Sequence, residues 1–336
     1  MKCAWLENMI SIETDGWTRP CCAEPSKNAR IAHINDGIMA AWNNPKLIEL
    51  RDNLKNGYSE KTRPFCGRCE ILESTNQASM RTSTPFITQD RTLKTIQFKM
   101  SNKCQLTCAH CGPELSTGWK KFLKITPIAT DGFEITEEFL EELVQLLPQI
   151  TCLKFTGGEP FLDPAHWKIL DYLKKYNRSH CTLQYITNGV SPFRPEVWEG
   201  WKSVNCSVSV DGFQESYEWF RRGAKWTDIV KGVDDLKKYT NVSINFAMTP
   251  YTIQDYHTAK EYWGTLDTYL VVYPSHANLI NFPIKEIKCL DNYQNIPHAL
   301  SASGSDTSTY KNWALFWDVK WNTIGWADKL FWWMNR

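Results

Sequence analysis

The chain has 336 residues, which is long enough for one large domain and a smaller companion. Its 38 Lys and Arg residues nearly balance 37 Asp and Glu residues, so no global basic field favours nucleic acid as a partner. The first residues carry no long apolar run, and no later stretch approaches the roughly 20 apolar residues that span a bilayer, so we expect a cytoplasmic protein without a membrane partner.

Residues 1–74 come first in chain order and are expected to form a cysteine-rich module. They hold two cysteine groups and only short apolar patches, and prolines interrupt any long element. Such a segment is poorly equipped to fold on buried apolar area alone. The following residues, 75–92, are rich in Ser, Thr and Asn and are expected to be a linker.

Residues 93–275 alternate short β-like runs with helical stretches. The six expected strands cover residues 95–101, 153–156, 182–187, 206–210, 242–248 and 269–273. The expected helices cover residues 137–147, 164–176, 195–202, 226–238 and 253–263. Alternating strands and helices predict an α/β fold with a parallel sheet, and six units predict an open, partial (β/α)6 barrel.

Residues 276–336 are expected to form a C-terminal extension. A polar loop at residues 301–308 precedes six tryptophans, of which Trp313, Trp317 and Trp321 recur every four residues. This spacing predicts a helix that presents one tryptophan-lined face, which we interpret as a sealing or interface surface.

The cysteines point to metal binding. Eight of the twelve fall into local groups, which are Cys3 with Cys21 and Cys22, Cys66 with Cys69, and Cys104 with Cys108 and Cys111. Disulfides are the less favoured interpretation, because the chain is larger than the small secreted domains that depend on them. The isolated cysteines, such as Cys206, are expected to lie in the core.

Cys104, Cys108 and Cys111 form a C-x3-C-x2-C triplet directly after the first expected strand. Three thiolates on one loop can bind three irons of a cubane cluster and leave the fourth iron without a protein ligand. A zinc site is the alternative, with His110 as a fourth ligand. Zinc usually pairs its cysteines as C-x2-C, and a histidine between two bound cysteines is poorly placed to reach the same ion.

Loops rich in glycine and polar residues follow the next three expected strands. They read Thr156-Gly157-Gly158-Glu159-Pro160, then Thr187-Asn188-Gly189, then Ser209-Val210-Asp211-Gly212. Each alone is compatible with an ordinary turn. Together with the triplet, and each at the carboxyl end of a strand where barrel active sites assemble, they indicate one functional site.

In these motifs the sequence resembles the radical S-adenosylmethionine (SAM) superfamily over roughly residues 92–275. The resemblance implies a 4Fe-4S cluster on the triplet with SAM at the open iron. It implies that the backbone at Gly157 and Gly158 approaches the SAM methionine, that Glu159 receives its ammonium group, and that Asn188, Ser209 and Asp211 contact its polar parts. The carboxylate of SAM is assigned to Arg221, with Arg222 as a neighbouring candidate, and His110 stands where an aromatic ring beside adenine is frequent.

Strand alternation gives a further expectation for the barrel interior. If Ser209 and Asp211 face inward, the apolar set on the first two strands faces the helices, and Gln97, Lys99 and Lys154 face the lumen. Unpaired buried lysines are costly, so the lumen should hold ligand and water. Lys99 and Lys154 are therefore candidate catalytic or substrate contacts, and lysines that extend to a wet rim are the equally weighted alternative.

Cys3, Cys21, Cys66 and Cys69 resemble the first part of the SPASM or twitch auxiliary-cluster module, here placed before the barrel. The resemblance implies a second iron–sulfur cluster held by these four cysteines, with Cys22 as a possible substitute. A structural zinc is the alternative, because four cysteines satisfy tetrahedral zinc equally well. Four ligands favour electron transfer over substrate binding as the role of this cluster.

The implied activity is reductive cleavage of SAM to a 5'-deoxyadenosyl radical that abstracts hydrogen from a substrate carbon. The auxiliary module favours a peptide or protein side chain as substrate, and a flavodoxin- or ferredoxin-type protein as reductant. A nucleotide or small metabolite is the alternative substrate. An iron–sulfur electron carrier or a zinc-stabilised binding protein without radical chemistry is the alternative from another class.

Overall fold

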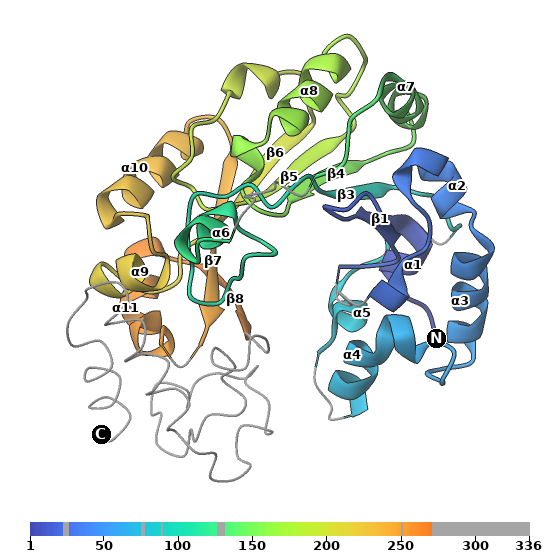
Figure 1. The fold of residues 1–336 in the computed structure, drawn as a ribbon, viewed down its shortest axis with the longest axis horizontal. Coiled ribbons are helices and arrows are strands. Elements are labelled where there is room, and N and C mark those ends of the chain that lie inside the picture. The colour runs from blue at the N-terminus through green and yellow to red at the C-terminus, as the bar shows by residue number, and fades with distance from the viewer. Residues whose placement is uncertain (23–26, 75–77, 89, 126–131, 250, 271–336) are drawn as a thin grey trace. The chain divides into compact units, whose positions relative to one another are not determined.

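The structure is a computed structural model that describes residues 1–22, 27–74, 78–88, 90–125, 132–249 and 251–270 (Figure 1). The expected tryptophan-rich tail, Cys289 and the end of the last expected strand lie outside these residues. The fold is mixed α/β, with one sheet in the strand order β2-β1-β3-β4-β5-β6-β7-β8. None of the helices in the described ranges is long and apolar enough to cross a membrane.

The six expected barrel strands are all present and correspond to β3 through β8. The strands are β1 (Met9–Ile12), β2 (Thr18–Arg19), β3 (Thr95–Lys99), β4 (Cys152–Thr156), β5 (Thr182–Thr187), β6 (Ser203–Ser209), β7 (Asn241–Met248) and β8 (Leu266–Leu270). The first two strands were not predicted, because both are short and lie in a segment interrupted by prolines.

Four of the five expected barrel helices are confirmed, the last as a 3-10 turn that continues into α11. The α-helices are α1 (Ala4–Asn8), α2 (Ile38–Trp42), α3 (Pro45–Lys55), α4 (Arg63–Ser74), α5 (Met80–Ser83), α6 (Thr117–Phe122), α7 (Glu137–Leu146), α8 (Pro164–Leu173), α9 (Glu215–Phe220), α10 (Trp226–Lys237) and α11 (Tyr256–Trp263). The 3-10 turns are η1 (Lys27–Ala29), η2 (Ile34–Asp36), η3 (Pro160–Leu162), η4 (Pro195–Val197) and η5 (Ile253–Asp255).

The helix expected over residues 195–202 was a wrong prediction. Only the 3-10 turn η4 forms there, and Gly200 adopts a φ of 79°, a left-handed conformation that no α-helix contains. Trp198 and Trp201 are instead buried as irregular chain against the protein interior.

The described chain divides into two compact units. The first contains Met1–Gln105, Pro113–Ser207 and Asp234–Val242. In it β1 pairs parallel with β3, Ile12 opposite Phe98, so the cysteine-rich segment supplies an edge of the same sheet that carries the first barrel strands. The segment expected to be a linker contains the short helix α5. The helices α7 and α8 lie along the same side of β3, β4 and β5 (Figure 1).

The apolar core of the first unit follows the predicted strand alternation. Phe98, Phe155 and Tyr185 occupy matching positions on β3, β4 and β5, and their rings stack with centroids 5.2 and 5.5 Å apart. His166 on α8 closes this row through a 3.0 Å hydrogen bond to the Tyr185 hydroxyl, and burial lowers its pKa to about 3. Cys206 is also buried, as expected.

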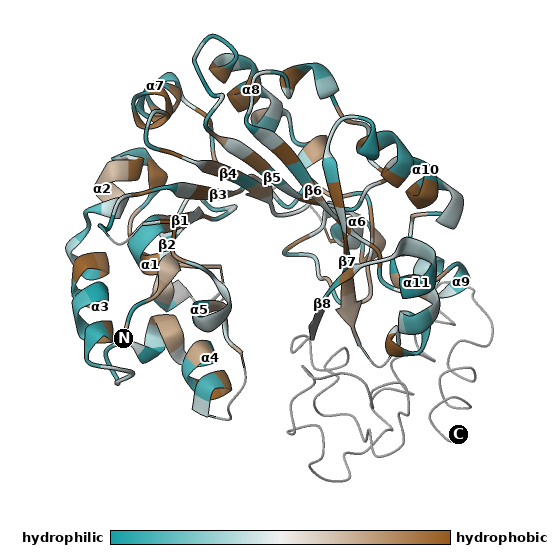
Figure 2. Ribbon diagram, turned by 180° about the vertical axis from the view of Figure 1, so that it is seen from behind, coloured by the Kyte–Doolittle hydropathy of each residue, from teal (hydrophilic) through white to brown (hydrophobic). Residues whose placement is uncertain are grey.

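The second unit contains Leu106–Gly112, Val208–Val233 and the residues from Ser243 onward. Its strands β7 and β8 pair parallel, Phe246 opposite Thr268. The helix α10 shows hydrophobic and hydrophilic faces in Figure 2, as the amphipathic pattern of its sequence predicts. Aromatic rings from α9, α10 and α11 pack together, with the Trp226 ring 5.6 Å from Tyr217 and 5.7 Å from Trp263.

Candidate functional site

The loop after β4 lies against the chain just before the first cysteine of the triplet. The backbone N–H of Gly158 donates to the Ser101 carbonyl at 2.8 Å, and that of Glu159 donates to the Lys103 carbonyl at 2.7 Å. A Cβ added to Gly158 would lie 2.5 Å from the Lys103 carbonyl oxygen, closer than side chains approach a backbone atom. The glycine is therefore required by the chain that leads into Cys104.

Replacing Gly158 with alanine is therefore expected to displace residues 101–103. Overpacking of this kind costs about 1 to 3 kcal/mol of unfolding free energy, and we expect a parallel loss of bound iron, measured by metal analysis. The control is Gly264→Ala, because the positive φ of Gly264 strains an alanine there while nothing lies within 4 Å of the added Cβ, so this variant carries backbone strain without a clash. Equal iron content in the two variants would contradict this account of the loop.

Glu159 is almost fully buried and its carboxylate is held by donors from the chain. It accepts hydrogen bonds from the Thr187 hydroxyl at 2.8 Å, from the backbone N–H of Asn188 at 2.7 Å and from that of Phe161 at 3.2 Å. Three donors stabilise an ionised carboxylate. The side chain predicted to receive the SAM ammonium group thus joins the loop after β4 to the end of β5.

Asn188 lies beside the start of the cysteine loop. Its side-chain amide donates to Gln105 Oε1 at 3.2 Å, and Gln105 in turn donates to the Ser191 hydroxyl at 3.0 Å. The Ser191 hydroxyl also bonds Asn188 Oδ1 at 3.2 Å, which closes a three-residue ring of polar contacts. Gln105, where many members of the resembled family carry asparagine, therefore ties Cys104 to the loop after β5.

The remainder of the cysteine loop belongs to the second unit and is paired there by its backbone. Thr107 N–H donates to the Arg222 carbonyl at 2.9 Å and Ala109 N–H donates to the Phe220 carbonyl at 2.8 Å. A turn brings Cys111 N–H to 3.0 Å from the Cys108 carbonyl. Two successive hydrogen bonds thus fix Cys108 against the end of α9.

Arg221 and Asp211 form a buried ion pair next to Cys108. The guanidinium donates to Asp211 Oδ2 from Nε at 2.8 Å and from Nη2 at 2.6 Å, while Ala247 N–H donates to Oδ1 at 2.6 Å. The third guanidinium nitrogen, Nη1, lies 3.8 Å from the Cys108 sulfur. The side chain of Arg221 is therefore directed at the cysteine loop.

His110 and Ser209 lie close to this pair. The His110 ring stacks on Phe220 with centroids 5.1 Å apart and an interplanar angle of 14°, and its Nδ1 is 4.0 Å from Asp211 Oδ2. Ser209 is the buried last residue of β6. The His110 ring is thus held by stacking on Phe220, next to Cys111 in the sequence.

The lysine predicted to face the barrel interior has a partner that the sequence did not reveal. Lys99 Nζ lies 2.8 Å from Glu13 Oε2, and Glu13 accepts a second hydrogen bond from the Ser11 hydroxyl at 2.9 Å. The Gln97 amide donates to Ser11 at 3.3 Å. Glu13 was missed because β1 was not predicted; the β1–β3 register places it beside Lys99. Lys154 lies opposite Gln97 on β4 and is half-buried.

The four cysteines of the N-terminal module line one cavity. Cys3, Cys21, Cys66 and Cys69 share it with apolar side chains that include Trp5 and Phe65. Cys66 and Cys69 face the cavity together because they are three positions apart on α4, almost one helical turn. Among the described residues Cys22 is half-exposed and does not belong to this wall.

The thiols of this cavity interact with one another. Burial raises the pKa of Cys3, and it raises the pKa of Cys66 to about 12, where Cys3 and Cys69 add to the effect. Adjacent buried thiolates are stable only beside a positive charge, which a bound metal supplies. Within the described residues no three His, Cys, Asp or Glu side chains are close enough to hold a single metal ion.

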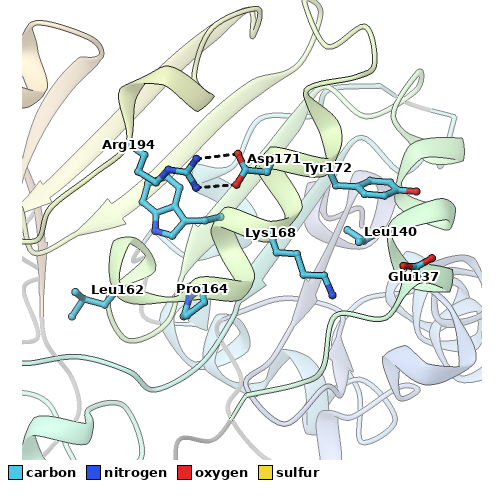
Figure 3. Close-up of a pocket in the computed structure, with 9 residues that line it drawn as sticks. Glu137, Leu140, Leu162, Pro164, Lys168, Asp171, Tyr172 and Arg194 are labelled. Atoms are coloured by element: carbon cyan, nitrogen blue, oxygen red, sulfur yellow. Dashed lines mark hydrogen bonds and ion pairs between the residues drawn. The ribbon is translucent and has the colours of Figure 1, made fainter.

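A second cavity opens on the surface between α7 and α8 and contains none of the predicted site residues. Figure 3 shows Arg194 bound to both carboxylate oxygens of Asp171, with distances of 2.8 and 3.1 Å, and Lys168 and Tyr172 on the same side of α8. The ion pair is exposed, so it provides a surface counterpart to the buried pair of Arg221 and Asp211.

Two family models match the chain. The Radical SAM superfamily model matches residues 98–262, and a model described as an iron–sulfur cluster-binding domain, SPASM, matches residues 3–70. Together they cover both cysteine sets. The cofactors that these families use are a 4Fe-4S cluster with SAM and a second iron–sulfur cluster.

Individual relatives are distant and larger. The chain is 24% identical over 166 residues to the mycofactocin maturase MftC of Mycobacterium ulcerans, covering 47% of this chain and 41% of that protein. It is 26% identical over 164 residues to YydG of Bacillus subtilis, provisionally named a peptide biosynthesis protein, covering 46% of each. The matched part is thus less than half the length of these relatives.

Among solved structures, Streptococcus suis SuiB bound to its precursor peptide SuiA aligns with 82% of this chain and 64% of its own, at 14% identity and a TM-score of 0.39. The family models and the cysteine motifs define the assignment. The chain carries a Radical SAM domain over residues 98–262 and a SPASM iron–sulfur cluster-binding domain over residues 3–70.

Proposed function

We propose that Cys104, Cys108 and Cys111 hold the 4Fe-4S cluster and that the enzyme uses it to cleave SAM reductively. The observation that carries this proposal is the way the cysteine loop is held, by backbone hydrogen bonds from Gly158 and Glu159 to the residues before Cys104 and by the carbonyls of Phe220 and Arg222 further on. When bound, the cluster supplies one electron to SAM, which yields methionine and a 5'-deoxyadenosyl radical that abstracts hydrogen from a substrate carbon.

The proposed contacts of SAM divide by unit. Glu159 and Asn188 in the first unit, and Arg221 in the second, are proposed to contact SAM from the positions in which hydrogen bonds within the chain hold them. In the first unit the backbone at Gly157 and Gly158 is assigned to the SAM methionine. In the second unit the contacts with SAM are assigned to His110, Ser209 and Asp211.

We propose a peptide or protein side chain as the substrate. The support is that the relatives with matching sequence include a protein named for peptide biosynthesis and one named a maturase. Gln97, Lys99 and Lys154, together with Glu13, form a polar row on β3, β4 and the end of β1 that suits the hydrogen-bonding groups of a peptide. A flavodoxin- or ferredoxin-type protein is proposed as the reductant.

Binding of SAM at an open iron has a direct spectroscopic test. The anaerobically reconstituted and reduced protein is examined by electron paramagnetic resonance with and without SAM. We expect SAM to change the spectrum of one cluster, because that cluster lacks a fourth protein ligand. A spectrum that is identical in both samples, at full iron content, contradicts the assignment of the triplet.

The second cluster is proposed at Cys3, Cys21, Cys66 and Cys69, with electron transfer as its role. Metal analysis of the variant in which Cys104, Cys108 and Cys111 are all alanine isolates this site. We expect iron and inorganic sulfide to remain in that variant, and to be lost when Cys66 and Cys69 are also replaced. Zinc without iron in the triple variant contradicts the proposed cluster and leaves the assignment of the triplet untouched.

A further inference from the structure

An arginine forms part of the wall of the cysteine-lined cavity. Arg81 on α5 lines the cavity together with Cys3, Cys66 and Cys69, so its positive charge lies in the same wall as the three thiols. It lies in the segment that the sequence predicted to be a linker, and beyond residues 3–70 that the SPASM model matches. Neither the cysteine spacing nor the family model assigns it a role.

The guanidinium of Arg81 is held in place from several directions. Its Nε donates to Glu73 Oε1 at 3.0 Å and lies 3.2 Å from the Tyr58 hydroxyl, and its Nη2 contacts Glu73 as well. Its Nη1 donates to the carbonyl of Lys2, the residue before Cys3, at 3.3 Å. The pair of Arg81 and Glu73 is mostly buried, so solvent screens its field only weakly.

Arg81 and Glu73 act on the cavity with opposite signs. Arg81 carries a positive charge in the cavity wall, and Glu73, its ion-pair partner, carries a negative charge. The charge of Arg81 stabilises a further negative charge in the cavity, and the charge of Glu73 opposes it. Reduction of an iron–sulfur cluster adds one electron, and nearby charges and hydrogen bonds set the potential at which it occurs.

We propose that Arg81 is a positioning residue of the auxiliary site, whose fixed positive charge raises the reduction potential of the cluster held by Cys3, Cys21, Cys66 and Cys69, with Glu73 limiting the effect. This inference rests on the proposed iron–sulfur cluster. An arginine suits the role because its guanidinium stays protonated beside thiolates and carboxylates alike, and because its planar group can bind Glu73 while facing the sulfurs.

The test uses the full chain in which Cys104, Cys108 and Cys111 are alanine, so that one cluster remains. The midpoint potential is measured by redox titration followed by electron paramagnetic resonance. Arg81→Gln is expected to shift the potential to more negative values, and Glu73→Gln to shift it to more positive values. A residue with a merely structural role would alter cluster content without producing shifts of opposite sign.

Arg63→Gln is the matched control. Arg63 binds Glu70 through two contacts of 3.1 Å on α4, the helix of Cys66 and Cys69, but it is exposed and does not line the cavity. Its replacement should leave the potential unchanged. Arg81→Lys keeps the charge without the planar group and should hold the potential closer to the parent than Arg81→Gln does.

The outcomes separate the inference from the function on which it rests. Zinc, or no cluster, in the parent triple variant overturns the auxiliary iron–sulfur site itself. An intact cluster whose potential is the same in parent, Arg81→Gln and Glu73→Gln, or that shifts in one direction in both variants, overturns the role of Arg81 alone. If Arg81→Gln loses its iron, Glu73→Gln alone tests the inference: a shift of the potential to more positive values supports it, and no shift or a negative shift overturns it.

Discussion

Replacing Cys108 with alanine is expected to reduce the formation of 5'-deoxyadenosine from SAM to the level of a protein-free blank. Cys108 is buried between the Thr107 and Ala109 backbone hydrogen bonds, which fix its position on the loop. Without Cys108 a cubane on this loop would be bound by two thiolates, with two irons lacking a protein ligand, and would be released. Iron content and 5'-deoxyadenosine are measured after anaerobic reconstitution.

Cys206→Ala is the control for this experiment. Cys206 on β6 is as buried as Cys108, but it lies in the apolar core, where burial raises its pKa to about 12. A buried thiol of this kind packs as a small apolar side chain. Its replacement should cost about 1 kcal/mol of stability and preserve both iron and 5'-deoxyadenosine. Equal losses in the two variants would mean that the effect of Cys108→Ala is structural.

Arg221→Gln is expected to lower the unfolding free energy by about 3 to 5 kcal/mol, because it leaves the buried carboxylate of Asp211 without its cation. Asp211 is fully buried and Arg221 nearly so. Equilibrium unfolding in urea, at matched metal content, measures the change. The same variant should release Cys108 from its contact with Arg221 Nη1 and so lower cluster content.

Arg194→Gln tests whether burial of the ion pair is the cause of the large loss of unfolding free energy expected for Arg221→Gln. Arg194 also binds its carboxylate partner, Asp171, through two guanidinium nitrogens, but on the exposed face of α8 (Figure 3), where such pairs contribute less than about 1 kcal/mol. Its loss should therefore be nearly neutral. A cost at Arg194 equal to that at Arg221 would contradict the interpretation of the buried pair.

The sequence was sufficient for the barrel strands and for the order of the loops at their ends. The first four of those strands alternate apolar and polar residues, as in Ile96, Phe98 and Met100, and each is followed by a loop with glycine or polar residues. The local sequence pattern is therefore enough to locate these strands and the loops that follow them. It was insufficient for β1, which is four residues long and gains its stability from pairing with β3, eighty-six positions along the chain.

The sequence also did not predict which charged residues would pair with one another. The sequence is compatible with Lys99 as a substrate contact or as a lysine at a wet rim, whereas the structure pairs it with Glu13. Arg221 and Asp211 were each expected to contact SAM, and their ten-residue separation gave no sign that α9 would bring them together. Arg81 falls in the expected linker because a four-residue helix leaves no periodic pattern. Side-chain pairing depends on the tertiary fold and cannot be read from local sequence.

The reduction of the reconstituted protein in the presence of SAM tests the central claim most directly. The intact enzyme, reduced anaerobically with dithionite, is predicted to convert SAM into 5'-deoxyadenosine and methionine, and the yield should depend on both reductant and SAM. The products are quantified by liquid chromatography and mass spectrometry. A protein that carries its full complement of iron and sulfide, and yet forms no 5'-deoxyadenosine, would contradict the assignment of radical chemistry to Cys104, Cys108 and Cys111.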